Sequence, residues 1–320
     1  MSEKEWLKQM TPKQTERNKS GGSSVVRTKT NRIETKKSSG FMDVAGMDEL
    51  KQFIIDSYVN VLNNRECAKA FRVHPPNILF YGPAGCGKTY FAEKAAEELG
   101  INFMKVIGSD IASTYVHGTQ EKIRELFRAA ERKAPTLLFF DELDAMAPSR
   151  NNRDNHYQNG ETNEFLCMLN NSADRGVYVM AATNHPDYID SSLLRTGRID
   201  KLVYIDLPDE EARKSLFRYE LSKLPVADDI DFEKLANITN GYNCSDISYI
   251  VSVASRKMFN ASIKEKDKPY QVITQEVLEQ VIQQQSPSVT NSDLKEYERL
   301  RWKFSPKDKN RQQSIIGFHI

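Results

Sequence analysis

Eight consecutive residues form a pattern that suits the binding of a phosphate chain. Residues 82–89 read Gly-Pro-Ala-Gly-Cys-Gly-Lys-Thr and satisfy G-x-x-x-x-G-K-[ST]. Glycines let backbone N–H groups wrap a β-phosphate, and the N-terminus of a following helix adds positive potential. We expect Lys88 to reach the β- and γ-phosphate oxygens and the Thr89 hydroxyl to bind magnesium. The predicted nucleotide contacts are Gly82, Pro83, Ala84, Gly85, Cys86, Gly87, Lys88, Thr89 and Tyr90.

A pair of acidic residues supplies the other groups that a magnesium nucleotide needs. Asp141 and Glu142 directly follow the apolar run Leu137–Phe140. We expect Asp141 to hold the metal through its coordinated water, and Glu142 to orient and deprotonate the water that attacks the γ-phosphate. Asn184 follows another apolar run, so it is expected either to reach the γ-phosphate or to form a structural turn.

The elements that position these residues alternate along the chain. Five short runs are apolar and rich in β-forming residues, as strands buried on both faces should be. They are 77–81, 102–107, 136–140, 177–182 and 202–206, with helical segments at 89–99, 119–132 and 161–172 between them. This order predicts an α/β fold over residues 41–207, a doubly wound, parallel, five-stranded sheet whose carboxyl edge gathers the polar residues.

The strand signal stops at Pro208, and apolar residues then recur at helical spacing. The clearest periodic segments are 212–221, 246–258 and 274–282. We therefore predict a smaller, all-helical lid domain over residues 208–303, followed by a C-terminal tail at 304–320.

Charge and composition limit the classes of function. The 320 residues hold 45 Lys and Arg against 44 Asp and Glu, but residues 1–40 alone hold ten basic and four acidic residues. We predict that these forty residues form a disordered basic tail, either a linker or an arm for an acidic partner. Four scattered cysteines and the absence of a leader or a long apolar run predict a cytoplasmic protein without membrane insertion.

Longer motifs resemble one protein family. In order, the chain contains GPAGCGKT, LLFFDELDAMAP, VYVMAATNHPDYID and SLLRTGRIDKLVYIDLPDEEAR. From Asp43 to Tyr297 it resembles the AAA family proper of the AAA+ ATPases, which includes valosin-containing protein, N-ethylmaleimide-sensitive factor and katanin. The resemblance implies a homohexameric ring with ATP and Mg²⁺ at each subunit interface. Asn184 matches the residue called sensor 1, and Arg195 and Arg198 match paired arginines that reach a neighbour's γ-phosphate.

Two segments resemble the family's adenine contacts. Asp43-Val-Ala-Gly resembles a D-[VI]-x-G stretch, which makes Ala45 and Gly46 candidate backbone contacts. The segment that begins at Gly241 and reads GYNCSDI resembles the family's G-[FY]-x-G-A-D-[IL] turn. Cys244 stands where the family has glycine, so Gly241 and Ser245 are the candidates in this turn.

The substrate class is argued from one loop. Tyr115-Val-His-Gly aligns with the family's central-pore loop, in which an aromatic residue grips an extended polypeptide. Tyr115 and Val116 therefore favour remodelling, unfolding or disassembly of protein substrates, with a protein substrate or adaptor as partner. The alternatives are an ATP-controlled scaffold that does not thread its partner and a nucleic-acid motor, for which the basic tail is the main support.

One residue of the phosphate loop carries a further expectation. Cys86 precedes Gly87 at the start of a predicted helix, and Lys88 is close in sequence. A helix N-terminus and a lysine both favour the thiolate, which predicts a lowered pKa for Cys86 and reactivity toward alkylating agents. The alternative is a thiol that fills a gap behind the loop.

Overall fold

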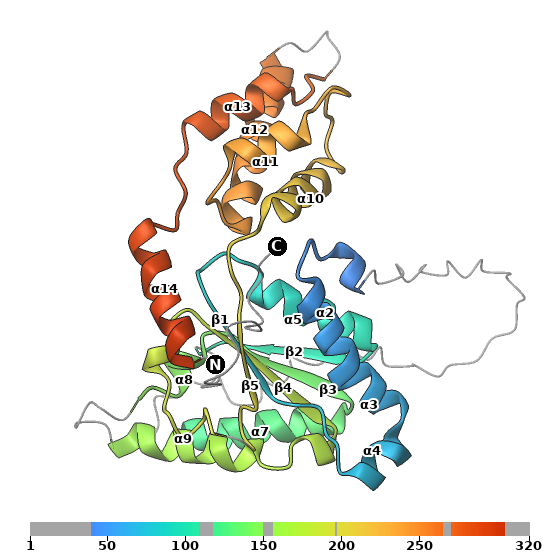
Figure 1. Ribbon diagram of the computed structural model, residues 1–320, viewed down its shortest axis with the longest axis vertical. Coiled ribbons are helices and arrows are strands. Elements are labelled where there is room, and N and C mark those ends of the chain that lie inside the picture. The colour runs from blue at the N-terminus through green and yellow to red at the C-terminus, as the bar shows by residue number, and fades with distance from the viewer. Residues whose placement is uncertain (1–39, 109–117, 150–155, 196, 265–269, 305–320) are drawn as a thin grey trace, which may run out of the picture. The chain divides into compact units, whose positions relative to one another are not determined.

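The computed structural model describes residues 40–108, 118–149, 156–195, 197–264 and 270–304 (Figure 1). The expected pore residues Tyr115 and Val116 and all but Gly40 of the expected basic tail lie outside these ranges. The description that follows concerns the described residues alone.

A parallel sheet forms the centre of the α/β part, which confirms the predicted fold class. Its strands are β1 (Ile78–Tyr81), β2 (Asn102–Val106), β3 (Thr136–Phe140), β4 (Val177–Thr183) and β5 (Lys201–Tyr204). They run in the order β2-β3-β4-β1-β5, and every neighbouring pair is parallel. The observed ends of the strands differ from the expected ones by at most two residues, and those of β3 coincide with them. Each of β1, β3 and β4 is buried along its whole length, as its apolar sequence requires.

Alternating side chains divide the interior into two layers. Leu138 and Phe140 of β3 point to the face covered by α7 (Gly118–Arg132) and α9 (His156–Leu169). Leu137 and Phe139 point to the opposite face, where α5 (Lys88–Leu99) and α2 (Asp48–Ile54) pack. Shorter elements complete these layers and their connections: η1 (Gly40–Asp43), η2 (Ile55–Val59), α3 (Asn60–Asn63), α4 (Arg65–Phe71), α8 (Leu143–Met146), η3 (Ala173–Arg175) and η4 (Pro186–Tyr188).

The residues after β5 are helical, and most of them form a separate core. The helices are α10 (Glu210–Leu221), α11 (Phe232–Ile238), α12 (Cys244–Lys264) and α13 (Gln275–Gln283). Asp209 and Asp231 cap α10 and α11 by accepting backbone N–H bonds. Phe217, Ile250 and Leu278 lie at the centre of this core. No helix in the described part of the chain combines the length and the apolar character that a membrane span requires.

The last described helix, α14 (Asn291–Phe304), leaves this helical core and returns to the sheet (Figure 1). Its Phe304 ring lies 5.9 Å from the ring of Tyr81 on β1, and its Tyr297 ring lies 6.4 Å from that of Tyr204 on β5. The prediction of a helical region at 208–303 did not anticipate that its final helix packs against the sheet.

Candidate nucleotide site

The phosphate loop leaves β1 at a position that only glycine can occupy. Gly82 has φ +145°, and a Cβ atom built there would lie 2.1 Å from the carbonyl oxygen of Ile205. Gly85 and Gly87 also have positive φ, at +75° and +85°. The three glycines therefore allow the loop to turn tightly from the buried strand into α5.

Lys88, the first residue of α5, is almost completely buried. Its Nζ donates hydrogen bonds to the carbonyl oxygens of Gly82 (2.8 Å) and Pro83 (2.6 Å). Burial lowers the pKa of Lys88 to about 8. An ammonium group removed from water interacts more strongly with an anion than an exposed one, so Lys88 is suited to bind a phosphate at this loop.

The two candidate metal ligands are in direct contact. The Thr89 hydroxyl donates a hydrogen bond of 3.0 Å to Oδ2 of Asp141. The same oxygen lies 2.8 Å from Nζ of Lys105, a contact that sequence reasoning missed. Among the described residues, no three His, Cys, Asp or Glu side chains gather to form a metal site of their own. This donor set fits a magnesium ion that takes its remaining ligands from phosphate and water.

The other predicted catalytic residues come to the same edge of the sheet. Glu142 directly follows Asp141, adopts a left-handed conformation with φ 55° and has an exposed side chain. Asn184 directly follows β4 and is half-buried. Beside it, the Thr183 hydroxyl donates to Asp144 of α8 at 2.6 Å, which fixes the end of β4 against the segment that carries Glu142. The structure thus brings the lysine, both acids and the asparagine to the ends of β1, β3 and β4.

The two candidate arginines lie on the connection between β4 and β5. Arg195 is exposed, whereas Arg198 is half-buried and donates from Nη1 to the carbonyl oxygen of Ser192 at 2.7 Å. Neither residue lines the pocket described next.

A pocket of about 680 Å³ adjoins the phosphate loop. Its volume is in the usual range for a small-molecule site. Ala45, Gly46, Gly85, Cys86, Gly87, Tyr90 and Ser245 line it, together with Leu207, Pro208, Ala212 and Tyr219. Gly241 does not line it, and the backbone N–H of Ser245 donates to the Gly85 carbonyl at 3.1 Å. The segments expected to contact adenine therefore meet at one pocket, with Gly241 outside it.

Comparison with known proteins agrees with this geometry. Residues 78–207 match the ATPase family associated with various cellular activities (AAA). The chain carries an AAA ATPase domain. It is similar to the cell division cycle protein 48 homolog of Archaeoglobus fulgidus, with 35% identity over 270 residues, which are 81% of this chain and 37% of the relative. The chain thus spans little more than a third of that relative's length. The match to this family indicates an ATP-hydrolysing domain.

Asn243 joins the helical region to the phosphate loop of the AAA domain and was not anticipated from the sequence. Its buried side chain donates from Nδ2 to the Ala84 carbonyl at 3.0 Å and to the Ser288 hydroxyl at 2.8 Å. Its Oδ1 accepts from the backbone N–H of Asp246, whose carboxylate accepts from the N–H of Asn243. This reciprocal cap at the start of α12 was visible in the sequence as Asn-x-x-Asp.

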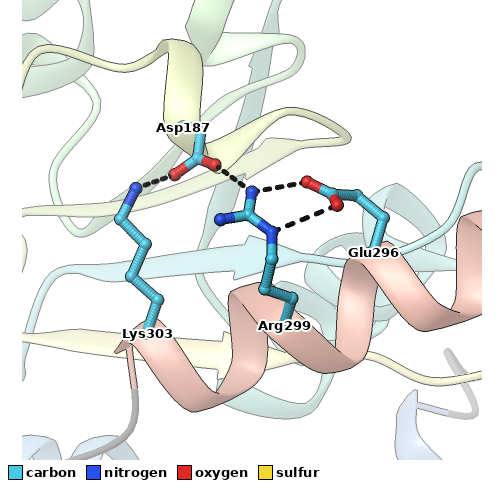
Figure 2. Close-up of polar contacts among 4 residues, drawn as sticks. All are labelled: Asp187, Glu296, Arg299 and Lys303. Atoms are coloured by element: carbon cyan, nitrogen blue, oxygen red, sulfur yellow. Dashed lines mark hydrogen bonds and ion pairs between the residues drawn. The ribbon is translucent and has the colours of Figure 1, made fainter.

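Helix α14 holds the segment that follows β4 of the AAA domain (Figure 2). The Tyr297 hydroxyl donates to the backbone carbonyl of Asn184 at 2.9 Å. Asp187, three residues further on, pairs with Arg299 at 3.2 Å and also with Lys303, while Arg299 pairs with Glu296 on its own helix. One carboxylate of η4 thus receives two cations from α14, next to the candidate catalytic asparagine.

The expectation that Cys86 has a lowered pKa and a reactive thiol is wrong. Burial raises the pKa of Cys86 to about 12, because its fully buried side chain loses the solvation of the thiolate. Cys244 adds to this rise, and Lys88 opposes it only in part. The thiol fills space behind the loop, as the alternative stated.

This environment predicts slow alkylation of Cys86. When the nucleotide-free protein is treated with N-ethylmaleimide near neutral pH, the exposed Cys67 and Cys167 should be modified fully before Cys86 reacts measurably. Mass spectrometry of the peptides would follow each site, and the protein in urea, where all four thiols should react, serves as control. Modification of Cys86 as fast as that of Cys67 would contradict the burial argument.

Proposed function

We propose that the protein hydrolyses MgATP at this site and couples hydrolysis to the remodelling of protein substrates. The observation that carries the proposal is the contact of Thr89 with Asp141, beside Lys88 and ahead of Glu142, at the carboxyl edge of the sheet. This is where a doubly wound fold binds its ligand. Adenine would enter the pocket between Ala45, Gly46, Gly85 and Ser245.

Each polar group has a separate task in this proposal. Lys88 would exchange its two loop carbonyls for phosphate oxygens, and Thr89 and Asp141 would hold Mg²⁺, which neutralises the charge of the β- and γ-phosphates. Glu142 would take the proton of the attacking water, and its exposed side chain leaves room for that water. Asn184 would orient the γ-phosphate from the end of β4.

A ring assembly would complete the site. Arg195 is exposed, so its side chain is available to the site of a neighbouring copy, as the family resemblance implies. An arginine supplied in this way contributes about 10³ or more in rate in related phosphoryl transfer. We propose a homohexamer on the family resemblance, with Arg198 holding the loop that presents Arg195.

Protein remodelling is preferred to the alternatives because Tyr115 and Val116 occupy the position of the family's pore loop. A scaffold that does not thread its partner remains the second candidate. A nucleic-acid motor is disfavoured, since residues 41–320 hold more acidic than basic residues. The partner would be a protein substrate or adaptor, met in the reducing cytoplasm where four free thiols are stable.

Two variants should affect ATP hydrolysis and ATP binding differently. Glu142→Gln should keep ATP affinity but lose at least about 100-fold in turnover, because the water-activating base is removed. Lys88→Ala should instead lose nucleotide binding. Calorimetry with ATP and a phosphate-release assay would measure the two properties, and equal hydrolysis by wild type and Glu142→Gln would refute the assignment of the base.

If Arg195 acts in the site of a neighbouring subunit, two inactive variants should restore activity to each other in mixed rings. Arg195→Ala and Lys88→Ala subunits should each be inactive alone, and mixing them should restore part of the ATPase activity. The restored activity would come from interfaces that combine an intact phosphate loop with an intact arginine. Native mass spectrometry would verify that the rings are mixed, and mixed rings without recovered activity would count against the trans role.

The threading proposal concerns Tyr115. In a Glu142→Gln background with ATP, the protein should retain fluorescently labelled casein, an unstructured polypeptide. Tyr115→Ala should weaken this binding by at least about tenfold, since loss of an aromatic anchor costs more than about 1.4 kcal/mol. Tyr270→Ala, which removes a tyrosine that is 86% exposed on the helical region, is the matched control. If both variants bind casein equally, the ATP-controlled scaffold that does not thread its partner becomes the preferred function.

A further inference from the structure

Lys105 lies at the candidate metal site although it belongs to a strand. It is the fourth residue of β2, which is an edge strand of the sheet. In the register of the parallel pair, Lys105 stands beside Phe139, and Asp141 lies two residues beyond Phe139. Residues two apart point to the same face of a strand, so the register itself brings the lysine and the carboxylate together.

The contact involves the carboxylate that we propose to hold the metal. Oδ2 of Asp141 accepts the Thr89 hydroxyl at 3.0 Å and lies 2.8 Å from Nζ of Lys105. The ammonium group therefore already neutralises the carboxylate at which Mg²⁺ would act. A cation with its own flexible stem and three donors can leave this oxygen without a change in the backbone.

The ion pair of Lys105 and Asp141 is too exposed to contribute much to the stability of the fold. The Lys105 side chain is 43% exposed and that of Asp141 is 22% exposed, and ion pairs at such positions contribute little to folding. Asp141 also contacts Thr89 at the phosphate loop, so the charge of Lys105 acts on any phosphate chain that binds there.

We propose that Lys105 is an internal counter-ion of Asp141 that competes with Mg²⁺ and reduces the dependence of nucleotide binding on metal. This inference rests on the proposed ATP site and deepens it. Without metal, the Lys105 charge limits the repulsion between Asp141 and the phosphates. When Mg²⁺ enters with the nucleotide, it displaces the ammonium from Oδ2.

The test is the ratio of two dissociation constants for ATP, measured by calorimetry in EDTA and in excess Mg²⁺. Full-length protein with Glu142→Gln is used throughout, so that ATP is not consumed. Lys105→Met should raise the ratio of the EDTA value to the Mg²⁺ value by at least about fivefold, which equals about 1 kcal/mol of coupling. Two effects raise the ratio. In EDTA, ATP is repelled by an Asp141 that no longer has a counter-ion, which raises the dissociation constant. In Mg²⁺, the metal no longer has to displace a cation, which lowers it.

Two further variants distinguish charge from structure. Lys105→Arg keeps the charge and should keep a ratio near that of the parent protein. Lys201→Met removes a lysine from the first position of β5, where its Nζ lies over the Phe53 ring at 5.4 Å, and should leave the ratio unchanged. Two results would overturn the role of Lys105. One is a ratio of dissociation constants for Lys105→Met that stays within twofold of the parent value. The other is an equal rise of the ratio in Lys105→Met and Lys105→Arg. If the parent protein, Glu142→Gln, binds ATP neither in EDTA nor in excess Mg²⁺, the nucleotide site itself is refuted.

Discussion

Because helices cover both faces of the sheet, its central strands have almost no place for polar side chains. Every residue of β1, β3 and β4 is buried, so the candidate catalytic groups of these segments appear only where the strands end. The phosphate loop, Asp141 and Asn184 occupy these three ends. The arrangement of the whole site therefore depends on the relative register of three buried strands. Edge strand β2 is only partly buried, which allows it to carry Lys105.

The features that sequence alone could predict are those with local signals. Runs of apolar residues marked the strands, and a motif of eight residues marked the phosphate loop. Tyr297, by contrast, reaches Asn184 across 113 residues of sequence, and no periodicity indicates such a pair. The pKa of Cys86 shows a second limit, since the charges near it are visible in the sequence but the burial that outweighs them is not.

The helical segments meet the phosphate end of the site at two points. Asn243 bonds to Ala84 of the phosphate loop, and Tyr297 of α14 bonds to the residue after β4. Asn243 also bonds to Ser288, which lies on the connection between α13 and α14. The helical region is thus joined to the phosphate loop at the start of α12 and to the end of β4 by α14. A few hydrogen bonds therefore connect the helices to the residues around the candidate site.

The return of α14 to the sheet has a topological consequence. Helices α10–α13, which share one hydrophobic core, are an insertion whose entry after Leu207 and exit before Asn291 are both fixed to the same α/β part. Besides these two connections, the bonds of Asn243 to Ala84 and of Ser245 to Gly85 hold the insertion to the phosphate loop. The docking of α14 closes a loop over residues 208–290, and this closure costs chain entropy that the contacts of α14 with the sheet must offset. Release of α14 would turn this insertion into a terminal domain, attached by the linker after Leu207 and by the bonds of Asn243 and Ser245 to the phosphate loop.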